Sequence, residues 1–135
     1  ILSEEIEKRK NIAMHYRKSL SSIEGIACLE DLKNVTHNYS YFPVFINKEK
    51  YGQTRDSIYF KLKDHNIFGR RYFYPLISEF PLYKGFPSAN PLSMPVASKI
   101  TQQVICLPIY ADLDLKAVDY ICHVLQQESK ANAVL

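Results

Sequence analysis

The pattern of apolar and polar positions predicts a long helix at the start of the chain. Apolar side chains recur at helical spacing over residues 3–20, at Ile6, Ala13, Tyr16 and Leu20. Acidic residues fall early in this stretch and basic residues fall late, which is the order that the dipole of a helix favours.

The same spacing predicts three further helices. Over residues 53–65 the repeating positions are Arg55, Ile58, Tyr59 and Leu62, and Asn66 stands where a left-handed residue ends a helix. Residues 96–103 are expected to form a short helix. A last helix is expected after Asp114, an N-cap residue, with an inward stripe of Leu115, Val118, Ile121, Cys122 and Leu125.

Three stretches rich in aromatic and β-branched residues are typical of strands: residues 39–46, residues 69–75 and residues 104–107. Pro43 has no amide donor, so the first of these strands is expected to lie at a sheet edge or to be bulged at that point. Pro108 ends the third.

The most unusual run of the sequence, Gly-Arg-Arg-Tyr-Phe-Tyr-Pro-Leu at residues 69–76, covers the second of these strands and the residue after it. Guanidinium groups offer paired donors to carboxylates and phosphates, and aromatic rings offer faces for stacking. On a strand, alternation places Tyr72 and Tyr74 on one face and Arg71 and Phe73 on the other. This chemistry indicates binding rather than bond breaking.

Residues 77–96 are expected to form an ordered loop without long regular elements, because four prolines and a glycine interrupt them. Loops of this length usually have a function. With about three short strands covered on one face by helices, the sequence predicts an α+β layer rather than a doubly wound parallel sheet. Residues 1–135 have the size of a single domain.

Composition agrees with an ordinary globular domain, at 47% hydrophobic and 23% charged residues. The formal net charge of +3 is too small to indicate a nucleic-acid or membrane surface, and no apolar run is long enough to span a bilayer. We therefore expect a cytoplasmic protein. The chain opens with Ile1 inside a helical pattern, so we expect it to be a piece of a longer polypeptide.

Catalytic and metal-binding patterns are weak. The three cysteines are widely spaced, and Cys106 and Cys122 are expected to be buried, reduced thiols. The four histidines show no spacing typical of a metal site. A Schiff-base lysine would have to be desolvated or lie beside another cation, and only Lys99 has mostly small or apolar neighbours; an exposed helix position is the better interpretation there. No catalytic residue is therefore predicted.

The ordered set of motifs resembles the C-terminal small domain of DegT/DnrJ/StrS-type sugar aminotransferases. The resemblance rests on the first helix, on Ser-Tyr-Phe-Pro-Val-Phe at 40–45, on Arg-Tyr-Phe-Tyr-Pro-Leu at 71–76 and on Leu-Pro-Ile-Tyr at 107–110. The sequence of residues 70–77 and 80–84 resembles that of family members that make the 4-amino sugar from dTDP-linked 4-keto-6-deoxyglucose. Many family members have His after Pro-Leu where this chain has Ile77, so no role of that His is assigned here.

The resemblance implies a fold type I pyridoxal-phosphate (PLP) enzyme, a homodimer that transfers an amino group from glutamate to a nucleotide-linked keto sugar. It implies that the large N-terminal domain, with the Schiff-base lysine, lies outside this chain, which would bind no cofactor and be inactive alone. Arg71 is then the candidate for a carboxylate or phosphate contact, and Tyr72 and Tyr74 are candidates for the sugar. Tyr83 and Lys84 are the weaker candidates for the nucleotide. A purely structural role for each of these residues remains open.

Two alternatives come from other functional classes. Aromatic and basic residues on a small sheet are also typical of a single-stranded nucleic-acid platform, with bases stacked on the rings of residues 72–74. However, the RNA-recognition consensus places its Gly after the basic residue, and here Gly69 precedes the arginine pair. The other alternative is a non-catalytic domain that binds a protein partner through its first helix.

Overall fold

A computed structural model describes residues 1–132 of the chain. Its three strands form one antiparallel sheet in the order β1-β2-β3, which confirms the α+β class. The elements are, in chain order, α1 (Leu2–Leu20), β1 (Ile26–Cys28), β2 (Phe42–Ile46), α2 (Lys48–Tyr51), α3 (Arg55–Asp64), α4 (Pro95–Thr101), β3 (Val104–Leu107) and α5 (Leu115–Gln127).

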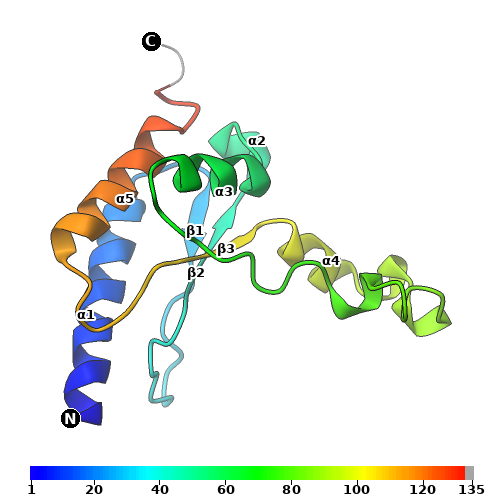
Figure 1. Cartoon of the computed structure of the whole chain (residues 1–135), viewed down its shortest axis with the longest axis horizontal. Helices are drawn as coiled ribbons and strands as arrows, with labels where there is room; N and C mark the ends of the chain where they lie inside the picture. Colours follow the sequence, from blue (N-terminus) through cyan, green and yellow to red (C-terminus); the bar gives the residue numbers. More distant parts are fainter. Residues whose placement is uncertain (133–135) are drawn as a thin grey trace.

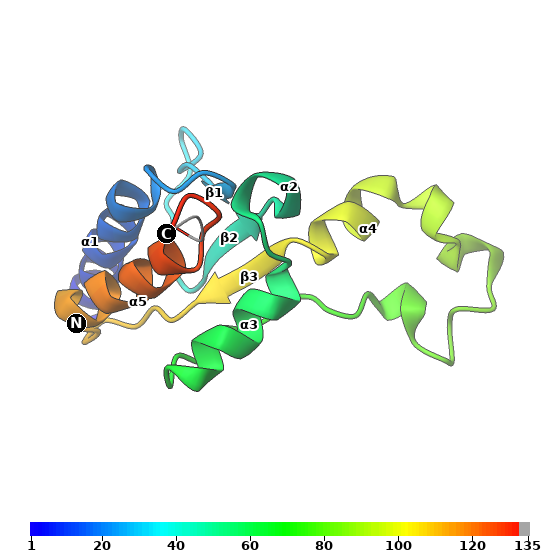
Figure 2. The same cartoon turned by 90° about the horizontal axis from the view of Figure 1, so that it is seen from above.

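One face of the sheet is covered by α1 and α5, which lie side by side, and α3 lies next to β3 (Figures 1 and 2). Phe42, Val44 and Ile46 alternate along β2 and are buried in the core between this face and the helices. Tyr16 of α1 belongs to the same core and stacks on Phe42 at 4.8 Å between ring centroids. The intervening side chains of β2, at Pro43 and Phe45, are only half buried on the other face.

The strand pairing differs from the sequence prediction at β1 and at Pro43. β1 was not expected; it pairs with β2 over three residues, from Ile26 opposite Ile46 to Cys28 opposite Val44. The expectation of an edge strand at Pro43 is wrong for β2, which is the central strand. Proline has no N–H to donate, and neither neighbouring strand requires one at this position. β1 ends opposite Val44, so it does not extend alongside Pro43. Cys106 lies opposite Pro43 on β3, but its backbone groups hydrogen-bond to Arg70.

The helices agree more closely with the prediction. The Thr54 hydroxyl caps α3 by accepting from Ser57 N–H at 3.1 Å, and Asn66 beyond it has the expected left-handed φ of 57°. Asp114 caps α5 as expected. Four of the five inward positions on α5 are buried, but Leu115 is 44% exposed, so its place in the stripe was wrong.

The 77–96 loop leads from the sheet region into α4 and extends away from the other helices (Figures 1 and 2). As expected, it holds no long element before α4, only the short 3-10 turns Ile77–Glu79, Pro87–Ala89 and Pro91–Ser93. Within residues 1–132, no helix has both the length and the apolar character that crossing a membrane requires. All three cysteines are free thiols, and Cys106 and Cys122 are buried as predicted.

Candidate functional site

The segment at residues 69–75 does not form the strand that was predicted. Within this segment only Arg70 pairs with β3; it exchanges N–H···O bonds of 2.9 and 2.8 Å with Cys106. The next carbonyl on that side of β3 belongs to Val104, and it accepts a 2.7 Å hydrogen bond from Nη1 of Arg55. A side chain thus bonds to this acceptor, and the ladder does not continue to Tyr72.

Without a strand, the predicted alternation of side chains is also wrong. Arg71 and Tyr74 lie together, with the guanidinium carbon of Arg71 4.9 Å from the centre of the Tyr74 ring. The same carbon lies 4.3 Å from the ring centre of Tyr59 on α3. Arg71 thus contacts two aromatic rings at distances typical of a cation–π interaction.

Arg55 is the central side chain of the site, and sequence reasoning missed its role. It stands on the inward stripe of α3, where an arginine among apolar positions was a usable signal. Its side chain has no exposed surface and its guanidinium carbon lies 4.7 Å from the centre of the Tyr74 ring. Nη2 is buried and has no hydrogen-bond partner among the described residues.

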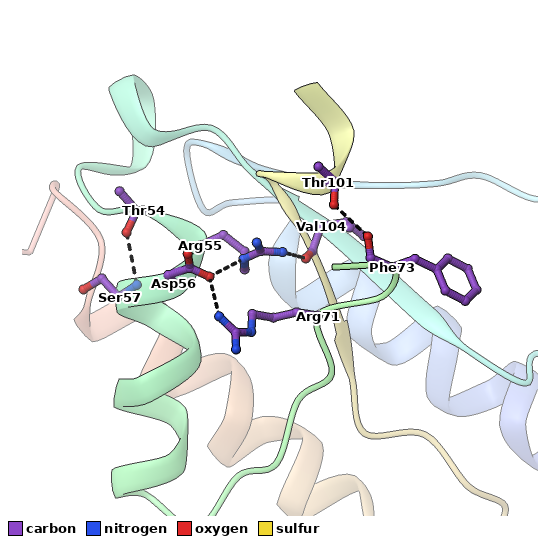
Figure 3. Close-up of polar contacts among 8 residues, drawn as sticks. All are labelled: Thr54, Arg55, Asp56, Ser57, Arg71, Phe73, Thr101 and Val104. Carbon is purple, nitrogen blue, oxygen red and sulfur yellow. Dashed lines mark hydrogen bonds and ion pairs between the residues drawn. The ribbon is translucent and has the colours of Figure 1, made fainter. Parts of the chain in front are cut away.

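Asp56 joins the two arginines (Figure 3). A single oxygen, Oδ1, accepts from Nε of Arg55 at 2.8 Å and from Nη1 of Arg71 at 3.1 Å. Partial burial would raise the pKa of this carboxyl, but the hydrogen bonds from Arg71 and Arg55, together with their charges, hold the pKa below its ordinary value. Two guanidiniums therefore share one carboxylate, which leaves a net positive charge at the site.

A mostly apolar hollow of about 580 Å³ adjoins this cluster, between residues 71–80 and Met94. Arg71, Tyr72 and Tyr74 line it together with Phe73 and Phe80. Thr101, buried on α4, fixes one wall by donating a 2.7 Å hydrogen bond to the carbonyl of Phe73 (Figure 3). The arrangement is suited to a ligand with an anionic group and an apolar or sugar face.

The predicted site residues are only partly brought together. Tyr72 turns toward the sheet, where its ring meets Tyr41 edge-on at 5.2 Å and its hydroxyl accepts from Arg70 at 2.9 Å. Tyr83 lies on the 77–96 loop and does not line the hollow. The stacking platform of the nucleic-acid alternative required a strand with parallel exposed rings, and residues 72–74 do not form one.

The described residues fit neither a metal ion nor covalently bound PLP. Between residues 1 and 132, no group of three or more His, Cys, Asp or Glu side chains is placed to hold a metal. Every lysine in this range is at least partly exposed, Lys99 on α4 included, so none has the desolvated setting of a Schiff-base lysine. We assign no chemical step through PLP to these residues.

Known proteins with similar sequences and structures agree on one family. The model of the DegT/DnrJ/EryC1/StrS aminotransferase family matches residues 1–126. The dTDP-4-amino-4,6-dideoxy-D-glucose transaminase of Escherichia coli is 42% identical over 89% of this chain and 32% of its own length. The chain thus spans about a third of that relative.

Solved structures show the same fold at lower identity. DesI, crystallised in the presence of its TDP-sugar product, superposes with a TM-score of 0.87 at 22% identity, over 98% of this chain and 33% of DesI. The PLP form of the putative sugar aminotransferase Spr1654 from Streptococcus pneumoniae gives 0.80 at 22% identity, over 95% of this chain and 32% of Spr1654. With its match to the family model over nearly its whole length, the chain belongs to the DegT/DnrJ/EryC1/StrS aminotransferase family.

Proposed function

We propose that this chain is the C-terminal small domain of a PLP-dependent aminotransferase that transfers an amino group from glutamate to dTDP-linked 4-keto-6-deoxyglucose. Family membership supports the reaction class. The substrate is supported by the 42% identity to a transaminase named for the 4-amino sugar. The full-length enzyme is a cytoplasmic homodimer in this proposal, and the large domain carries the cofactor.

The observation that carries the proposal is the positively charged, aromatic wall of the hollow. Arg71 reaches this wall with its guanidinium partly exposed, at 27% of its side-chain surface. In the proposed enzyme Arg71 binds a phosphate or carboxylate of the substrate, because a guanidinium gives directed, charge-assisted hydrogen bonds. Tyr74, 39% exposed beside it, offers its ring and hydroxyl to the sugar.

The two remaining tyrosines have less direct roles. Tyr72 lines the hollow, and its hydroxyl, already bonded to Arg70, offers a second hydrogen bond to a sugar hydroxyl. Tyr83 is 42% exposed on the 77–96 loop and contacts the nucleotide only when the loop rests against the rest of the enzyme. The apolar wall excludes water from the bound sugar.

PLP, when bound in the large domain, supplies the electron sink that amino-group exchange requires. Residues of this chain contribute binding and orientation of the substrate. The chain alone is therefore expected to bind no PLP and to show no transaminase activity.

The test begins with the gene. The reading frame upstream of Ile1 is expected to encode a large α/β domain with a lysine in a Ser/Thr-rich strand-end context. The purified full-length protein is expected to absorb as a PLP enzyme and to aminate dTDP-4-keto-6-deoxyglucose with glutamate. An unrelated upstream sequence, or a PLP-loaded protein that aminates no nucleotide-linked keto sugar, would overturn the proposal.

Arg71→Met tests the assigned contact. Loss of a charge-assisted hydrogen bond is expected to raise the KM of one substrate by about 10- to 100-fold. Arg17→Gln is the control, since it removes an ion-paired arginine of α1 that lies outside the hollow. A KM unchanged for both substrates would remove Arg71 from the binding site.

A further inference from the structure

The two arginines that share Asp56 are held very differently. Arg55 is fully buried, and it is fixed by the Val104 carbonyl and by Asp56 at 2.7 and 2.8 Å. Arg71 is partly exposed and makes one longer hydrogen bond, of 3.1 Å, to the same carboxylate oxygen. Arg55 is therefore the fixed partner of Asp56, and Arg71 is the partner that is able to leave.

Because Asp56 has two cationic partners, it stays neutralised when one of them leaves. Breaking a partly buried ion pair is costly when it leaves a carboxylate without a cation. Asp56 keeps Arg55 when Arg71 turns away, so that cost is avoided. Arg71 also contacts the rings of Tyr59 and Tyr74, which hold the guanidinium without neutralising its charge.

We propose that Arg55 is a positioning residue that keeps Asp56 neutralised, so that Arg71 exchanges Asp56 for an anionic group of the substrate. The inference rests on the function proposed above and deepens it. The anionic group is a phosphate of the nucleotide or a carboxylate of the amino donor, since both offer the oxygen pair that a guanidinium binds. Without Arg55, Arg71 becomes the only cation of Asp56 and is held away from the substrate.

A purely structural role for Arg55 makes a different prediction. If Arg55 only ties α3 to β3, its removal lowers stability, and a second substitution at Asp56 cannot restore substrate binding. If Arg55 frees Arg71, removal of Asp56 as well removes the competitor for Arg71, and binding returns. The double variant separates the two roles.

The experiment uses the full-length, PLP-loaded enzyme carrying Arg55→Gln, Asp56→Asn or both. Arg55→Gln is expected to raise the KM of one substrate about tenfold or more while kcat changes less. Adding Asp56→Asn is expected to bring that KM back to within about threefold of the wild type. The KM that responds, that of the nucleotide sugar or that of glutamate, identifies phosphate or carboxylate as the bound anion.

Three results would overturn the inference: an unchanged KM in a folded Arg55→Gln enzyme, a double variant that binds no better than Arg55→Gln, or an Asp56→Asn enzyme whose KM rises. The single Asp56→Asn variant decides the matter if Arg55→Gln does not fold, because we expect its KM to equal or fall below that of the wild type. Arg17→Gln again serves as the control for loss of an ion-paired arginine.

Failure of the proposed function is recognised separately. A wild-type enzyme that transfers no amino group to the keto sugar refutes the function before any variant is compared. Calorimetric titration of the same variants with dTDP provides a readout that does not depend on turnover. If phosphate is the anion, the dissociation constant of dTDP is expected to follow the same order as the KM; if carboxylate is, the dissociation constant of dTDP stays constant and the KM of glutamate follows that order.

Discussion

The hydroxyl of Thr101 donates a 2.7 Å hydrogen bond to the carbonyl oxygen of Phe73, across 28 positions of the sequence. Thr101 is 2% exposed at the end of α4, whereas the Phe73 side chain is 75% exposed at the hollow. This bond fixes the backbone that carries Arg71 and Tyr74, although no ladder bonds support residues 71–75. A buried side chain thus replaces sheet pairing as the anchor of the site.

Thr101→Val is expected to loosen this segment. The substitution keeps the shape of the side chain but removes the donor, so the Phe73 carbonyl loses its partner at a cost of about 1 kcal/mol. Amide exchange at Arg70 and Cys106, which hydrogen-bond to each other at the start of the segment, is expected to become faster in the full-length protein, as measured by mass spectrometry. Thr36→Val, at an exposed position, is the control. Equal exchange in both variants would show that Thr101 does not hold the segment.

Gly25 provides a sharp test of the packing between β1 and α2. Its φ is +86°, and a Cβ there would lie 2.4 Å from the backbone nitrogen of Tyr51. Gly25→Ala is therefore expected to destabilise the domain by about 2 to 4 kcal/mol, through backbone strain and overpacking. Gly85→Ala is the matched control, because no atom lies within 4 Å of the added carbon. Thermal unfolding of the two variants compares them directly; similar midpoints would contradict the close approach.

Local signals in the sequence predicted α1, α3, α4 and α5, but not the four-residue α2. Asp114, the predicted start of α5, caps it through a hydrogen bond from a backbone group two residues away, so the information is local. β1 has only three residues and depends on pairing with β2, which no local pattern specifies. Leu115 fell on the helical stripe, but at the first turn of α5 it extends beyond the neighbouring core.

The candidate site was harder to predict, because long-range contacts decide it. The aromatic and basic run has the composition of a strand, but only Arg70 in it pairs with β3, and the Val104 carbonyl accepts a hydrogen bond from Arg55, 49 positions away. The binding role that the sequence indicates for residues 71–74 stays a prediction, and the strand alternation predicted for their side chains was wrong.

The three cysteines are expected to differ in reactivity. Burial raises the pKa of Cys122 to about 12, and burial also raises the pKa values of Cys106 and Cys28. Cys28 is only half buried, whereas the other two are buried. Because the thiolate is the reactive form, iodoacetamide at pH 8 is expected to label Cys28 first.

Peptide mapping by mass spectrometry after brief labelling of the native protein measures this order. Labelling in urea is the control, since unfolding is expected to make the three rates similar. Native labelling of Cys122 as fast as that of Cys28 would contradict the burial of α5 against α1.

The ion pair of Asp31 with Arg17 predicts a pH-dependent contribution to stability. Asp31 accepts hydrogen bonds from Arg17 at 2.7 Å and from Tyr39 at 2.5 Å, and these bonds, that of Arg17 first, hold its pKa below the ordinary value. A carboxyl with a lowered native pKa binds fewer protons in the folded than in the unfolded state near pH 4. Its stabilisation is therefore complete at neutral pH and is lost as the pH falls through the native pKa.

Asp31→Asn is expected to lower stability at pH 7 by less than about 1 kcal/mol, because Asp31 is exposed and its ion pair is screened by solvent. The difference from the wild type is expected to shrink as the pH falls below about 4, where Asp31 itself becomes protonated. Thermal unfolding midpoints between pH 7 and pH 3 measure the difference. Asp64→Asn, at an exposed position outside the ion pairs of residues 1–132, is the control and should show no such trend. A difference that stays constant with pH would mean that the charge of Asp31 does not stabilise the loop against α1.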